Sequence, residues 1–115
     1  EIEVLREMTL DTKFSSDERF LAVYLLGYTA NPAAQTALWD VARAPVSTEF
    51  KPDSVLYHQE LVLRAQALLG LNRQLPESQR KSEMSAYAES QRELFLSRLA
   101  YRLTREPAGK ASVGF

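Results

Sequence analysis

The stretch at residues 17–38, DERFLAVYLLGYTANPAAQTAL, holds one helix-forming segment, its end and the start of the next. Just before it, Ser15 and Glu18 have the spacing of a capping box, in which each side chain accepts the other residue's backbone N–H. Further on, Asn31 is a favourable N-cap, and Pro32 suits the first helical position because its missing N–H has no partner there. The stretch therefore predicts two helices, one from the serine cap to about Tyr28 and one from Pro32 to about Arg43.

Both helices carry apolar residues at the spacing of a buried face. In the first helix these residues form two adjacent rows, Leu21, Leu25 and Tyr28 in one and Phe20 and Tyr24 in the other. We therefore expect the aromatic residues to lie mostly in the core. In the second helix the inward residues are expected to be Ala34, Leu38, Val41 and Ala42. Trp39 lies off that face and is expected to be half exposed.

The same start and stop signals predict three further helices. A short helix is expected over Ile2–Leu10. A helix capped by Asp53 follows the two-proline loop 44–53 and ends at Gly70, which suits the left-handed position past a helix end. A long helix is then expected from Glu77 to Arg105. The predicted fold class is all-α, with four to five antiparallel helices in a bundle or a short α-solenoid.

Length and composition bound the organisation of the chain. Its 115 residues, 45% hydrophobic and 25% charged, are typical of one globular domain. We expect residues 1–107 to form a single helical domain and residues 108–115 to form a flexible tail. No run of about 20 apolar residues occurs, so no membrane insertion is expected. We expect a soluble protein, and the absence of cysteine fits the cytoplasm and the periplasm alike. Because the sequence begins at Glu1, the chain is expected to be processed or truncated.

Two segments echo each other at an offset of 43 residues. Residues 22–27 (AVYLLG) and 65–70 (AQALLG) both read A-x-x-L-L-G. Pro32 and Pro76, at an offset of 44, each open the next helix. Helix-pair repeats have periods of about 40–47 residues, although the same short pattern also arises in any bundle rich in leucine and alanine.

The first of these units resembles a HEAT-type helical repeat, a relative of the armadillo repeat. The matching positions are Arg19, Ala22, Leu26, Gly27, Asn31, Pro32 and Leu38. The likeness covers residues 17–70 and weakens in the second unit, where Arg64 abuts Ala65. The loop at 44–53 is longer than usual, and two units are fewer than the three or so that a solenoid needs. The resemblance implies a scaffold or partner-binding surface and no chemistry.

Residues that usually carry catalysis or hold a metal are scarce. His58 is the only histidine, and the absence of cysteine excludes a His/Cys zinc site. No phosphate-binding loop or nucleophile motif appears. The carboxylate pairs Asp17–Glu18 and Glu89/Glu93 are interpreted as helix-start and surface charges. We therefore predict a non-enzymatic protein without cofactor or metal, and an enzyme that uses carboxylates alone is the least favoured alternative.

Charge is unevenly distributed along a chain whose net charge is −1. Residues 1–60 hold ten acidic and five basic residues, whereas residues 61–115 hold five acidic and nine basic ones. Arg98, Arg102 and Arg105 fall at i, i+4 and i+7 on the last helix, with Tyr101 beside them. Such a stripe is typical of a solvated face or of a surface paired with the acidic part, and it is also typical of a phosphate-binding site.

These observations predict a protein–protein interaction module or adaptor, either as a separate protein or as one domain of a larger chain. The candidate partner-binding residues are Trp39, Arg98, Tyr101, Arg102 and Arg105. Trp39 is included because an exposed tryptophan commonly anchors an interface. The expected partner is another protein. The alternative is a small nucleic-acid-associated regulator that uses the basic stripe, and a salt titration distinguishes the two because phosphate contacts weaken steeply with salt.

Overall fold

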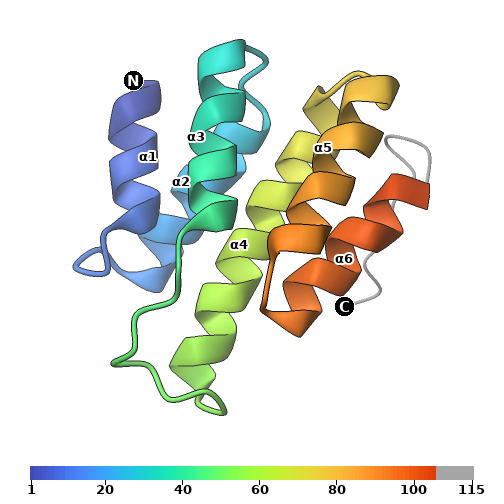
Figure 1. The fold of residues 1–115 in the computed structure, drawn as a ribbon. Coiled ribbons are helices and arrows are strands. Elements are labelled where there is room, and N and C mark those ends of the chain that lie inside the picture. The colour runs from blue at the N-terminus through green and yellow to red at the C-terminus, as the bar shows by residue number, and fades with distance from the viewer. Residues whose placement is uncertain (106–115) are drawn as a thin grey trace.

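The structure is a computed structural model that describes residues 1–105, and Figure 1 shows its six helices. They are α1 (Ile2–Leu10), α2 (Ser16–Gly27), α3 (Pro32–Arg43), α4 (Val55–Gln74), α5 (Glu77–Ser90) and α6 (Leu94–Arg105). Residues 1–105 contain no strand, so the predicted all-α class is confirmed, but the helices number six rather than four to five. None of these six helices is both long and apolar enough to cross a membrane. The predicted tail, residues 108–115, lies outside the described residues.

The caps of α2 and α3 are those that the sequence predicts. The Ser15 hydroxyl accepts the Glu18 N–H at 3.2 Å, and the Glu18 carboxylate accepts the Ser15 N–H at 3.0 Å. The Asn31 side chain accepts the Ala34 N–H at 3.1 Å, and Pro32 occupies the first helical position of α3. These local bonds fix where both helices begin without help from the rest of the fold.

The start and the end of α4 differ from the prediction. Ser54 is the N-cap in place of Asp53, and its hydroxyl accepts the Tyr57 N–H at 3.1 Å. Gly70 does not end the helix, because α4 continues through it to Gln74. Neither this glycine nor its counterpart in α2 has the left-handed backbone that a glycine cap would require.

The two glycines instead let α2 and α4 approach closely. The helices lie side by side in the same direction: the Ser16 hydroxyl is 3.3 Å from the Gln59 side-chain oxygen at one end, and Gly27 meets Gly70 at the other. A Cβ added at Gly70 would lie 2.8 Å from the Gly27 Cα, closer than packed atoms allow. Both contacts have the 43-residue offset of the sequence echo. The first A-x-x-L-L-G segment therefore ends a helix, as its position predicts, whereas the second lies inside α4, and both mark a close helix contact.

The long helix predicted from Glu77 to Arg105 is interrupted at residues 91–93. Glu93 directly precedes α6, and its carboxylate accepts the Phe95 N–H at 2.7 Å in the manner of an N-cap. The interruption folds α6 back along α5. The Ser97 hydroxyl donates to the Ala88 carbonyl at 2.8 Å across the pair.

The six helices form three antiparallel pairs, α1–α2, α3–α4 and α5–α6. At the far end of the last pair, the buried Arg80 of α5 donates to the carbonyl of Leu103 in the final turn of α6, where a cation is favoured. The second members of the pairs, α2, α4 and α6, pack next to one another with α4 in the middle (Figure 1). One side of α4 thus faces α2, and its other side faces α6.

The burial of three aromatic residues differs from the prediction, whereas Phe20 is partly buried against the core as expected. Trp39, expected to be half exposed, is only 6% exposed and its ring centroid lies 5.7 Å from that of Tyr87. Tyr24 and Tyr28, expected in the core, are exposed, as are Leu21 and Leu25 of the same helix. The reason is that α2 turns its smaller residues inward. The buried positions of α2 include Ala22, Val23, Leu26 and Gly27.

A buried ionic network ties α2 to α4. The Arg19 guanidinium donates to both Glu60 carboxylate oxygens at 2.5 and 3.0 Å, and Arg64 donates to Glu60 at 3.1 Å. Arg19 also donates to the Thr9 carbonyl, and Arg64 donates to the Ala44 carbonyl. Burial raises the pKa of Glu60, but the hydrogen bonds from the two arginines outweigh it and hold that pKa below its usual value. The network therefore joins the end of α1 and the start of the 44–54 loop to the core.

Candidate functional site

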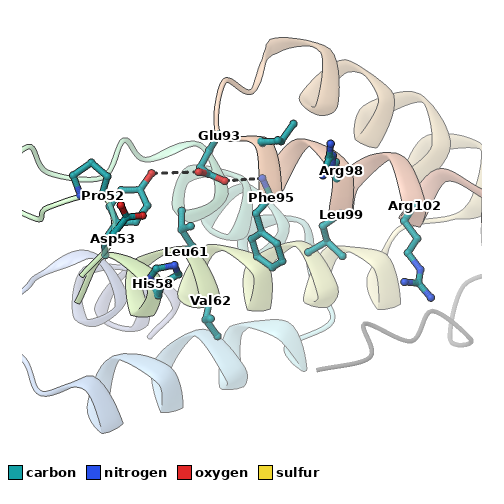
Figure 2. Close-up of a pocket in the computed structure, with 12 residues that line it drawn as sticks. Pro52, Asp53, His58, Leu61, Val62, Glu93, Phe95, Arg98, Leu99 and Arg102 are labelled. Atoms are coloured by element: carbon teal, nitrogen blue, oxygen red, sulfur yellow. Dashed lines mark hydrogen bonds between the residues drawn. The ribbon is translucent and has the colours of Figure 1, made fainter. Parts of the chain in front are cut away.

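An open groove of about 770 Å³ lies between the first half of α4 and α6 (Figure 2). Its volume falls in the range of sites that bind small molecules or short peptide segments. The residues that line it are Pro52, Asp53, Tyr57, His58, Leu61, Val62, Glu93, Leu94, Phe95, Arg98, Leu99 and Arg102. They come from two segments more than 30 residues apart in the sequence, which explains why no local motif marks the groove.

The start of α6 is fixed to α4 by one carboxylate. Glu93 accepts the Phe95 N–H at 2.7 Å and the Tyr57 hydroxyl proton at 3.3 Å, as the dashed lines in Figure 2 show. Burial, followed by the nearby Glu93 charge, raises the pKa of Tyr57, so the phenol stays a donor. This pair therefore sets the position of α6 relative to α4 at one end of the groove.

The floor of the groove is apolar. Leu61 of α4 and Leu99 of α6 are buried, and Phe95 is partly exposed between them. In Figure 2, Phe95 and Leu99 point from α6 toward α4. Leu94 is 57% exposed at the edge of the groove, because α6 begins at this residue and turns Leu96 into the core.

Charges are separated along the length of the groove. Asp53 and the capping Glu93 lie toward one end, and Arg98 and Arg102 lie toward the other (Figure 2). Arg98 is exposed and makes no ion pair within residues 1–105. The rim therefore presents the Arg98 guanidinium beside an apolar floor.

The His58 ring contacts the residue that caps its own helix. Its Nδ1 lies 2.8 Å from the Ser54 carbonyl, and since a carbonyl only accepts, Nδ1 carries the proton in this contact. Within residues 1–105, no three His, Asp or Glu side chains gather as a metal ion would require.

The predicted partner-binding residues do not all lie at one site. Arg98 and Arg102 line the groove, whereas Tyr101 and Arg105 are exposed on α6 outside it. Trp39 is buried between α3 and α5, with the Arg43 guanidinium 4.7 Å from its ring centroid. The prediction that Trp39 is an exposed anchor is therefore wrong, because the face of α3 beyond Leu38 is covered by Tyr87.

Sequence patterns do not identify several of the groove residues. Tyr57, Glu93 and Leu94 carry no motif, and Glu93 is a residue type that rarely signals an N-cap. One signal was present: the first half of the segment 77–105 is polar and its second half is strongly amphipathic. That change of character coincides with the interruption at residues 91–93.

Comparison of the chain with protein-family models, curated proteins and solved structures finds no match.

Proposed function

We propose that the chain is a non-enzymatic protein-interaction module, and that it holds a segment of a partner protein in the groove between α4 and α6. The observation that carries the proposal is the groove itself, an apolar floor open to solvent with the exposed Leu94 at its edge. Apolar grooves between helices commonly bind the apolar face of an amphipathic segment. The HEAT-type likeness of residues 17–70 agrees with such a role and stays a prediction.

A peptide partner accounts for the groove better than nucleic acid does. Phosphate backbones are bound by many cations, and each contact adds to the salt dependence of binding. The groove offers two arginines beside an apolar floor formed by residues such as Leu61 and Leu99. A phosphate backbone is charged and polar, so it would make no apolar contacts with this floor. The basic stripe alone therefore supports the nucleic-acid alternative less well.

The test is selection of peptides of about 16 residues from a random display library, followed by binding to two matched variants. Leu94→Asp places a charge at the groove edge. Leu21→Asp is the control, because Leu21 of α2 is also 57% exposed but does not line the groove. Both are surface changes that should cost about 0.5 kcal/mol of stability or less, which circular dichroism and urea unfolding would check.

We expect selected peptides to lose binding to Leu94→Asp and to keep it with Leu21→Asp. Peptides that bind Leu94→Asp as well as they bind the original chain would place the interaction elsewhere. A library that yields no binder would contradict the proposal as well.

A further inference from the structure

The groove residues also indicate the chemistry of its occupant. Arg98 is exposed at the rim and has no ion-pair partner within residues 1–105, and Arg102 lines the same end. The carboxylate of Glu93 already accepts two hydrogen bonds, from Tyr57 and from the Phe95 N–H. The fixed charge offered to an incoming ligand at the Arg98 end is therefore positive.

The length of the groove along α6 is that of a short helix. The span from Glu93 to Arg102 on α6 is nine residues, or about 14 Å of helix, which corresponds to between two and three turns. A ligand helix of that length presents three or four apolar side chains at i, i+3, i+4 and i+7 to one surface. Acidic side chains on its flank would then lie within reach of Arg98.

Resting on the proposed function, we infer that the occupant of the groove is an acidic amphipathic helix of a partner protein. Its apolar face covers Leu61, Phe95 and Leu99, and its Asp or Glu side chains pair with the guanidinium of Arg98. Charged pairs at a rim contribute modestly to affinity but select the partner by charge. The inference thus concerns which segments the groove accepts.

The experiment uses the tightest peptide from the display library and two versions in which its Asp and Glu residues are replaced by Gln or by Lys. Each is titrated against the full chain, against Arg98→Glu and against Lys81→Glu by fluorescence anisotropy. Lys81→Glu makes the same change in net charge on an exposed residue of α5 that does not line the groove. A 16-nucleotide single strand and a 16-base-pair duplex are titrated beside them.

We expect the acidic peptide to bind the original chain and Lys81→Glu about fivefold more tightly than its Gln version, the size that one or two rim ion pairs supply. With Arg98→Glu the order should reverse, so that the Lys version binds best. The acidic preference should shrink toward 1 M salt, where the Debye length is about 3 Å, while the apolar part of the affinity remains.

Two outcomes overturn the inference in distinguishable ways. In the first outcome, peptide affinity depends on Leu94 but changes neither with the Gln replacement nor with Arg98→Glu. The chain would then be an interaction module whose groove does not select acidic segments. Oligonucleotides that bind more tightly than every peptide, with an affinity that falls linearly against salt on logarithmic axes, would overturn the proposed function together with the inference.

Discussion

At the scale of single residues, the Glu60 carboxylate is the centre of a buried ionic network. It is buried and accepts hydrogen bonds from Arg19 and Arg64, so its removal leaves two buried guanidinium groups without their counter-ion. Breaking one partner of a buried ion pair typically costs about 3–5 kcal/mol. We expect Glu60→Gln to lower the free energy of unfolding at neutral pH by that amount, measured by urea unfolding. The exposed Glu89→Gln should change it little.

The difference in stability between the original chain and Glu60→Gln is also expected to depend on pH. Because the pKa of Glu60 is lower in the folded protein than its usual value of 4.5, its stabilising contribution is present above that value. It is lost as the pH falls through the folded pKa, because protonation ends the pairing with both arginines. The gap in stability between the original chain and Glu60→Gln should therefore narrow as the pH is lowered from about 5 toward 3. A gap that stays constant over this range would mean that folding does not lower the pKa of Glu60.

Trp39 gives a second prediction at this scale, and it separates a packing role from a binding role. The ring is buried against Tyr87, and the indole N–H has no hydrogen-bond acceptor within residues 1–105. Trp39→Ala should therefore cost about 3–5 kcal/mol of stability through the cavity it leaves. Trp39→Phe should cost much less, since the lost N–H donates to none of these residues. Thermal unfolding of both variants tests this, and equal losses would contradict it.

At the scale of helices, the contact between α2 and α4 depends on two residues without a Cβ. A Cβ at Gly70 would lie 2.8 Å from the backbone of Gly27, whereas a Cβ at Gly27 would mainly meet the mobile end of the Arg73 side chain, at 2.7 Å. Overpacking typically costs about 1–3 kcal/mol, whereas replacing glycine with alanine inside a helix stabilises it by about 1 kcal/mol through helix propensity. We expect Gly70→Ala to destabilise the protein more than Gly27→Ala, as urea unfolding would show. The reverse order would mean that α4 shifts more easily than Arg73 does.

The elements also show which structural signals a sequence carries. α1 and the start of α3 follow from apolar spacing and from caps that act within a few residues, such as Asn31. The end of α4 does not, because Gly70 has two uses, a left-handed cap and a close helix contact. Only the position of Gly27 on a distant helix decides between them. The break before α6 likewise depends on Tyr57 and Glu93, which meet only after folding.

At the scale of the whole molecule, the groove could be predicted only in part. Arg98 and Arg102 share one face of a helix by their spacing alone, so the sequence places them together. Their apolar neighbour Leu61 lies on another helix and reads in the sequence as an ordinary core leucine. The exposure of Leu94 depends on α6 starting at that residue. A site assembled from two helices therefore appears only once the packing of the helices is known.

The groove exists only while α6 is docked against α4, and Glu93 provides a polar link between the two at the start of α6. Its carboxylate caps α6 through the Phe95 N–H and accepts the Tyr57 hydroxyl proton from α4. Glu93→Ala removes both bonds and should cost about 0.5–2 kcal/mol, the usual value of a helix cap. Glu93→Gln keeps an acceptor oxygen and should cost less. We expect Glu93→Ala to speed amide hydrogen exchange in the first turns of α6 while leaving α2 unchanged, because the opening is local. Peptide affinity should fall in the same variant in proportion to the opened fraction. Unchanged exchange in α6 would show instead that the other contacts of α6 with α4 and α5 hold this helix in place.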